Sequence, residues 1–242
     1  MGYVALFGQV DITSANSTIT VDGNSGDITT GSYYLYSPTG SASFLDVFVA
    51  AVTALSDTTV TYTISSTGVV TLTGEQAFTL VTTGTGINIW LGLSSSLSGA
   101  SSYTGSTQMH YCWFPQLLTG DALSPVAVQG SIVPIFNQAR APSGSVYTSK
   151  YGELREQSIS LSFITSALTW NASDDYSSLE EFYQDTLSEG RPFLYLPNWP
   201  TDETAVEYVC NLKTHGAFTK NMKRMIPGTD LYWSYKFDLW GV

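Results

Sequence analysis

Apolar residues alternate with polar ones along much of this chain, which is the pattern of half-buried β-strands. The alternation is clearest in the following segments: residues 4–12, 19–21, 31–36, 60–64, 159–163, 191–197, 206–212 and 233–239. Short apolar pairs at Val70 with Leu72 and at Phe78 with Leu80 predict further strands, and another alternating run covers residues 87–93.

Two segments instead repeat their apolar residues every three or four positions, the spacing of an amphipathic helix. The first covers residues 44–55, and Ser43 with Asp46 resembles a capping box at its start. The second covers residues 174–189, with a capping box formed by Ser177 and Glu180. Gly190 then stands where a helix commonly ends in a left-handed residue.

Two further segments lack this regularity. Residues 93–106 are rich in Ser and Gly and predict a loop. Beyond them, prolines recur every eight to ten residues, at 115, 125, 134 and 142, which should break up any long strand. The pattern therefore predicts a mainly β (α+β) fold of two β-sandwich-like units with one helix each. These are residues 1–106 and 155–242, joined by a connecting arm at 107–154.

Charge divides the chain at nearly the same place. The first 139 residues contain no Lys or Arg and seven acids, whereas all nine basic residues lie from Arg140 onward beside thirteen acids. A surface without basic residues does not neutralise phosphates, so we expect no specific nucleic-acid binding there. It does not attach to anionic lipid either. Such a surface suits a protein partner, or a passage wall to which DNA should not adhere.

The candidate catalytic groups are better explained by structure. Asp174, Asp175, Glu180 and Glu181 could form a hydrolase pair, but they lie at the predicted start of a helix, where acids cap free N–H groups. His110 and Cys112 with Cys210 and His215 could bind zinc, although their spacing is unlike that of structural zinc sites. We therefore expect no catalytic residue, no metal site and no cofactor, and hence no enzyme.

Cys112 and Cys210 also leave two alternatives, a disulfide or two reduced and buried thiols, and the second is favoured. The N-terminus lacks a secretory pattern, and the longest apolar stretch, residues 44–55, is interrupted by Asp46 and too short to span a bilayer. These features predict a soluble chain made in a cytoplasm, without membrane insertion.

Four of the nine basic residues fall within twelve positions. They are candidate subunit contacts, against another copy of this acidic chain: Lys213, Lys220, Lys223 and Arg224. The alternative is a solvated hairpin. Trp90, Trp113 and Trp233 are expected to anchor a core or an interface rather than to stack on sugars.

Two sets of segments resemble virion proteins. The runs at residues 27–36, 44–55, 60–65, 78–85 and 90–93 resemble a module common in such proteins, in which a helix packs on a small sheet. Residues 155–163, the second helix and the runs at 190–195, 208–210 and 235–240 resemble the C-terminal part of minor tail and distal-tail proteins of long-tailed bacteriophages.

The resemblance implies a non-enzymatic, ring-forming tail or tail-tip subunit that lines or joins the DNA conduit of a tailed phage. Its partners would be copies of itself and other phage tail proteins, and its location would be the virion tail after synthesis in the host cytoplasm. The alternative from a different class is a carbohydrate-binding or adhesin module of a phage or cell surface.

Overall fold

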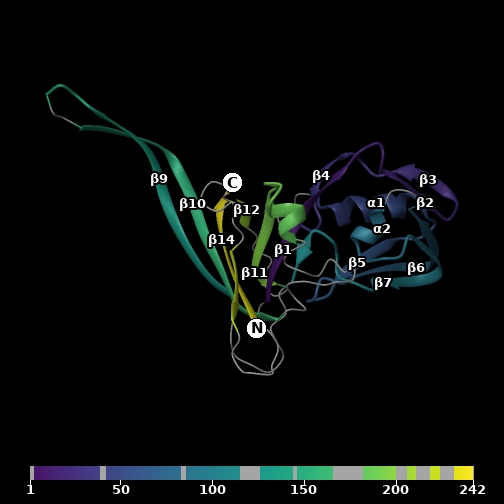
Figure 1. Cartoon of the computed structure of the whole chain (residues 1–242). Coiled ribbons are helices and arrows are strands. Elements are labelled where there is room, and N and C mark those ends of the chain that lie inside the picture. Colours follow the sequence, from purple (N-terminus) through teal and green to yellow (C-terminus); the bar gives the residue numbers. More distant parts are fainter. Residues whose placement is uncertain are drawn as a thin grey trace.

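The protein is mainly β, with two antiparallel sheets and few helices, as the sequence pattern predicts. The computed structural model describes residues 3–38, 42–82, 86–114, 126–143, 146–165, 182–199, 206–210, 219–223 and 232–241. Figure 1 shows the smaller sheet with its helix at one end of the molecule and a long two-stranded hairpin at the other.

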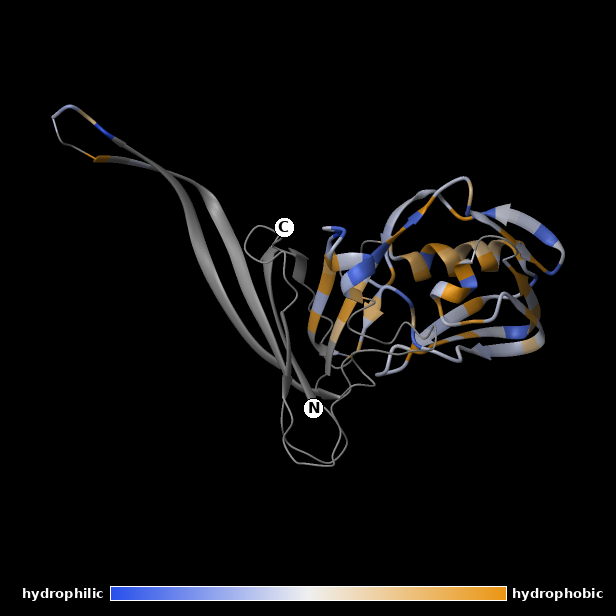
Figure 2. Ribbon diagram, viewed as in Figure 1, coloured by the Kyte–Doolittle hydropathy of each residue, from blue (hydrophilic) through white to orange (hydrophobic). Residues whose placement is uncertain are grey.

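The smaller sheet, with α1 (Phe44–Leu55), forms what we call the five-stranded unit. Within the described residues its strands are β2 (Thr18–Val21), β3 (Asn24–Asp27), β5 (Val60–Ile64), β6 (Val70–Val81) and β7 (Ser96–Thr104). The order is β3-β2-β6-β5, and β7 also pairs with β6. Figure 2 shows apolar residues concentrated along α1, whereas the strands of this unit mix apolar and polar residues.

Helix α1 forms where its sequence predicts it. The Ser43 side chain accepts a hydrogen bond from the backbone of Asp46, and the Asp46 carboxylate accepts one from the Ser43 backbone, which completes the capping box. Its apolar face is fully covered at Phe44, Phe48 and Val52. At the other end, the side-chain amide of Asn24 donates to the carbonyl of Leu55 at 3.0 Å, which satisfies a free C-terminal carbonyl.

The larger sheet has nine strands among the described residues, with the path β4-β1-β11-β12-β14-β10-β9. From the N-terminal part come β1 (Tyr3–Ile12), β4 (Gly31–Tyr34) and the short β8 (Cys112–Trp113). The other strands are β9 (Val126–Arg140), β10 (Val146–Thr165), β11 (Phe193–Trp199), β12 (Val206–Cys210), β13 (Thr219–Lys223) and β14 (Tyr232–Gly241). Strand β13 pairs with β14 and β8 pairs with β1.

One hydrophobic core joins the two sheets. Phe7 of β1 contacts the rings of Tyr36, Phe114 and Trp199, with ring centroids 5.2–5.3 Å apart. Trp199 belongs to β11, so the C-terminal half of the chain contributes directly to the core over which α1 packs. Such aromatic contacts stabilise beyond the area that they bury.

The outer half of the β9–β10 hairpin pairs only with itself within the described chain. Pairing of β10 with β14 begins at Glu156, opposite Trp240, whereas its pairing with β9 continues outward to Val146 opposite Arg140. We call residues 132–155 the arm, which is a different segment from the connecting arm predicted at 107–154. Nine residues per strand extend for about 30 Å, and Figure 1 shows the arm leaving the body of the molecule.

Three local predictions were wrong, each because tertiary contact outweighed local preference. The Ser- and Gly-rich segment expected to be a loop contains β7, since hydrogen bonding to β6 compensates for weak strand propensity. Residues 87–93 were expected to continue the strand pattern, but Ile87–Trp90 is the short helix α2. Ile87 and Leu91 are buried there at helical spacing while Ile89 is exposed.

The third error concerns proline. Pro134 lies inside the fifteen-residue strand β9, opposite Glu153. A proline fits there because β9 is the last strand on the described sheet path, and an edge strand needs no donor on its outer side.

The first half of the second predicted helix, including Ser177 and Glu180, lies outside the described residues. The end of this helix is described. Phe182 is helical, Tyr183–Leu187 form the π-helix η1, and Gly190 has a left-handed φ of 66°. The division at 1–106, 107–154 and 155–242 stays a prediction. The strand pairing adds two facts about this division. β1, from the first predicted part, belongs to the same sheet as the strands of the last part, and β10 continues across the predicted boundary at residue 154.

Candidate functional site

A cleft of about 380 Å³ opens where the five-stranded unit meets the larger sheet. Its walls come from the end of β1, from Trp90 of α2, from Tyr111 before β8, and from residues 184–191 around η1. Segments far apart in the sequence therefore build it, and we call it the acidic cleft because of the charges described next.

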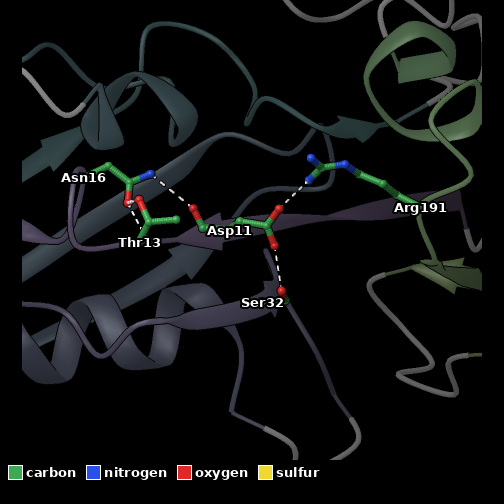
Figure 3. Close-up of polar contacts among 5 residues, drawn as sticks. All are labelled: Asp11, Thr13, Asn16, Ser32 and Arg191. Atoms are coloured by element: carbon green, nitrogen blue, oxygen red, sulfur yellow. Dashed lines mark hydrogen bonds and ion pairs between the residues drawn. The ribbon is translucent and has the colours of Figure 1, made fainter.

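Asp11 is held on one side of the cleft by a short polar network (Figure 3). Its carboxylate accepts a hydrogen bond from the Ser32 hydroxyl at 2.6 Å and an ion-paired one from Arg191 Nη1 at 3.1 Å. Asn16 donates to the Asp11 carbonyl at 3.1 Å and accepts from the Thr13 backbone at 2.7 Å. The side chains of Arg191 and Asp11 are 39% and 47% exposed, so this ion pair positions more than it stabilises.

Two further acids, Asp185 and Glu189, lie on the wall formed by η1 and the turn after it. Partial burial raises the pKa of Asp185, and the charge of Glu189 raises it further, whereas Arg191 acts in the opposite direction. Arg191 is thus the single basic residue among the described residues that line the cleft, whereas three of them, Asp11, Asp185 and Glu189, are carboxylates. The cleft has an excess of negative charge at neutral pH, which favours a cationic group over an anionic one.

The remaining walls are aromatic. Trp90 and Tyr111 meet edge to face, with ring centroids 6.1 Å apart, and Trp90 also packs on Phe44 of α1. The Trp90 carbonyl accepts the backbone N–H of His110 at 2.8 Å, which ties α2 to the segment before β8. Burial lowers the pKa of His110 to about 4, so this imidazole is neutral at pH 7.

Gly8 fixes how closely β1 approaches the cleft. Its N–H donates to the Tyr111 carbonyl at 2.7 Å. A Cβ at this position would lie 2.6 Å from that carbonyl oxygen and 2.8 Å from Oγ1 of Thr186 in η1. A larger residue would therefore push apart two walls of the cleft.

The acids of the five-stranded unit are exposed and unopposed by local bases. This holds for Asp22, Asp27, Asp46, Asp57 and Glu75, each of which is exposed. Since the first basic residue of the chain is Arg140, no Lys or Arg within this unit can pair with them. Its surface is therefore uniformly negative or neutral.

The predicted contact residues are only partly described. Lys220 and Lys223 lie on β13, opposite Tyr235 and Tyr232 of β14. Lys213 and Arg224 lie outside the described residues, as do the predicted helix-cap acids Asp174, Asp175, Glu180 and Glu181.

Of the predicted metal donors, His110 and Cys112 are buried, and Cys112 is a free thiol rather than part of a disulfide. Burial raises the pKa of this thiol well above its ordinary value. Within the described part of the chain, no three His, Cys, Asp or Glu side chains gather as metal ligands. Trp113 is a core residue, as expected, whereas Trp90 is only half-buried and lines the cleft.

The sequence did not single out the acidic cleft. Asp11 is one of many acids scattered along the sequence, and the apolar spacing predicts only that Asp185 and Glu189 belong to a helix. The available signal was Gly190 followed by Arg191, which marks a helix end next to a basic residue but says nothing about Asp11, 180 positions away.

None of the helices that the structure describes is long and apolar enough to cross a bilayer. In comparisons with known proteins, no family model matches the sequence and no curated protein matches it.

Proposed function

We propose that this chain is a non-enzymatic structural subunit of a bacteriophage tail, which assembles with copies of itself into a ring at or near the tail tip. The observation that carries the proposal is the arm. An isolated two-stranded ribbon is at best marginally stable in water. The arm nevertheless extends beyond the sheet with no further described strand beside it, as expected of an element that a neighbouring subunit covers.

The charge distribution supports the same function. Copies arranged in a ring could direct the base-free, acidic surface of the five-stranded unit toward a central passage. Such a wall repels the phosphates of passing DNA instead of binding them. The sequence resemblance to minor tail and distal-tail proteins points to this location in the virion, with other tail proteins as neighbours.

Purified protein imaged by negative-stain electron microscopy, together with its mass by light scattering, tests this function. Rings with a fixed number of copies are expected. A matched variant in which a two-residue Asn-Gly turn replaces residues 134–153 should stay folded but lose the rings. Wild-type protein that stays monomeric over the whole concentration range, alone and with other tail proteins, would refute the proposal.

The second candidate is a carbohydrate-binding module, and the acidic cleft is the observation that favours it. Aromatic rings beside carboxylates and the Gln184 side chain are groups that bind sugars. A glycan array separates the two functions. Binding that Trp90→Ala abolishes, by a chain that remains a monomer, would favour the carbohydrate-binding module.

A further inference from the structure

The tip of the arm presents a basic and an apolar side chain together. Arg140 and Val146 are directly opposite each other in the last described pair of the hairpin. Arg140 is exposed, and Val146 is 53% exposed. The whole arm also carries three bases, Arg140, Lys150 and Arg155, against one acid, Glu153, so it is basic within an otherwise acidic chain.

The acidic cleft and helix α2, which contributes Trp90 to it, carry the complementary groups. Asp185 and Glu189 supply negative charge on its η1 wall. Ile89, next to Trp90 in α2, is 47% exposed. Among the side chains whose exposure the structure describes, Ile89 and Val146 are the large hydrophobic ones that are exposed. Ile89 directly precedes the cleft residue Trp90 in α2, and Val146 lies at the basic tip.

The arm cannot make this contact within its own chain. Figure 1 shows the tip of the hairpin pointing away from the body, while α2 lies at the other end of the molecule, beyond β11 and β1. The tip and the cleft are also different surface regions. A contact between them in two copies is therefore head-to-tail and repeats from copy to copy, which is the geometry that generates rings.

We propose that the arm tip of one copy docks at the acidic cleft of the next, with Arg140 facing Asp185 and Glu189 and Val146 packing on Ile89. This inference rests on the proposed function and names the surfaces by which the copies meet. The ion pair sets the register and speeds encounter, and the apolar pair excludes water beside it.

The cleft fits a guanidinium better than a sugar. Its excess of carboxylates over Arg191 is not needed for a neutral ligand, whereas it balances an incoming cation. Trp90 and Tyr111 meet edge to face and so do not form a continuous flat platform for a pyranose ring. Trp90 is half-buried in the wall of the cleft, and an indole ring next to carboxylates suits a guanidinium through a cation–π contact.

A charge swap tests the ionic half of the contact. Arg140→Glu and Glu189→Arg are each expected to weaken self-association about tenfold by light scattering. The double variant restores opposite charges and should return to within about threefold of wild type. Asp57→Arg is the matched control, because it makes the same charge change at an exposed acid outside the cleft and should leave a tip contact unchanged.

Cross-linking tests the apolar half without relying on complete rings. Ile89→Cys and Val146→Cys are made as separate proteins in a Cys210→Ala background, with buried Cys112 retained. Mixed and oxidised, they are expected to give a heterodimer on a non-reducing gel, which neither protein alone can give.

The outcomes separate the two proposals. Rings that form unchanged in both charge variants, with no cross-link in the mixture, would leave the ring function standing and overturn the tip contact. Glycan binding at the cleft that Trp90→Ala removes, with assembly unaffected, would also overturn it. A wild-type chain that does not assemble, together with cysteine variants that give no cross-link when mixed, would reject both proposals.

Discussion

The five-stranded unit and the arm both consist of antiparallel β-strands, but these strands differ in what they pair with and pack on. In the five-stranded unit, apolar positions such as Ile19, Leu72 and Leu80 lie in the same core as the buried face of α1. In the arm, two strands pair with each other and leave Arg140 and Val146 exposed at the tip. The first region therefore stabilises the monomer, whereas the second is the region that we propose contacts another copy.

This difference predicts where substitutions act. Changes within the five-stranded unit should lower the free energy of unfolding of the monomer. Changes at the arm tip should leave that free energy almost unchanged and appear only in assembly. The predictions below test this contrast, beginning with the largest effect.

Phe48→Ala should cost about 3–5 kcal/mol of unfolding free energy, because it leaves a cavity beneath α1 where the ring is fully buried. Val146→Ala at the arm tip is the control and should change the free energy of unfolding by less than about 0.5 kcal/mol. Urea denaturation of both variants checks the pair. Equal losses of unfolding free energy would show that the arm unfolds together with the rest of the monomer. That result would contradict the contrast between the five-stranded unit and the arm.

Gly68→Ala should cost about 2–4 kcal/mol, the sum of left-handed backbone strain and overpacking. Gly68 has φ +79°, and an added Cβ would lie 2.1 Å from the ring of Phe114. Gly99 has a similar φ of +75° with nothing within 4 Å, so Gly99→Ala isolates the strain. Thermal unfolding that shows no difference between the two would mean that Phe114 moves aside freely.

His110 should make the junction of the two sheets sensitive to acid. Burial lowers its pKa from 6.5 to about 4, so its contribution to stability is present above pH 6.5 and is lost as pH falls toward 4. The loss reaches about 3 kcal/mol at most, at 1.36 kcal/mol per pKa unit. Denaturation of wild type and His110→Asn from pH 8 to pH 4 should show the steeper decline in wild type.

The other histidine of the chain, His215, provides the control for this experiment, since His215→Asn makes the same substitution elsewhere in the sequence. Its pH profile is expected to follow that of wild type. A His110→Asn profile parallel to wild type across this range would contradict the assignment of the acid sensitivity to His110.

Ser43→Ala should have the smallest effect, a loss of about 1 kcal/mol, because it removes the hydroxyl half of the capping box. Ser43→Thr retains the hydroxyl, which both accepts from the Asp46 backbone and donates to the Asp46 carboxylate, and should recover most of that loss. Circular dichroism during denaturation measures both variants. An alanine variant as stable as wild type would show that packing alone fixes the start of α1.

Periodicity and capping chemistry by themselves determined much of the local structure. The helix at Phe44–Leu55 and the strands at β1, β2, β5, β12 and β14 lie where the apolar spacing predicts them, because that spacing distinguishes helical from extended backbone. The absence of basic residues before Arg140 likewise determines, from the sequence alone, that the five-stranded unit carries only negative side-chain charges.

Only the tertiary structure decided the features that depend on distant partners. Ser96–Thr104 is a strand because β6 offers hydrogen bonds, and Pro134 is accommodated because β9 lies at an edge. The acidic cleft exists because β1 and β11 pair, which brings Asp11 to Arg191. Spacing along a sequence reports which face a residue occupies, but contact between residues 180 positions apart is set by how strands are ordered in a sheet.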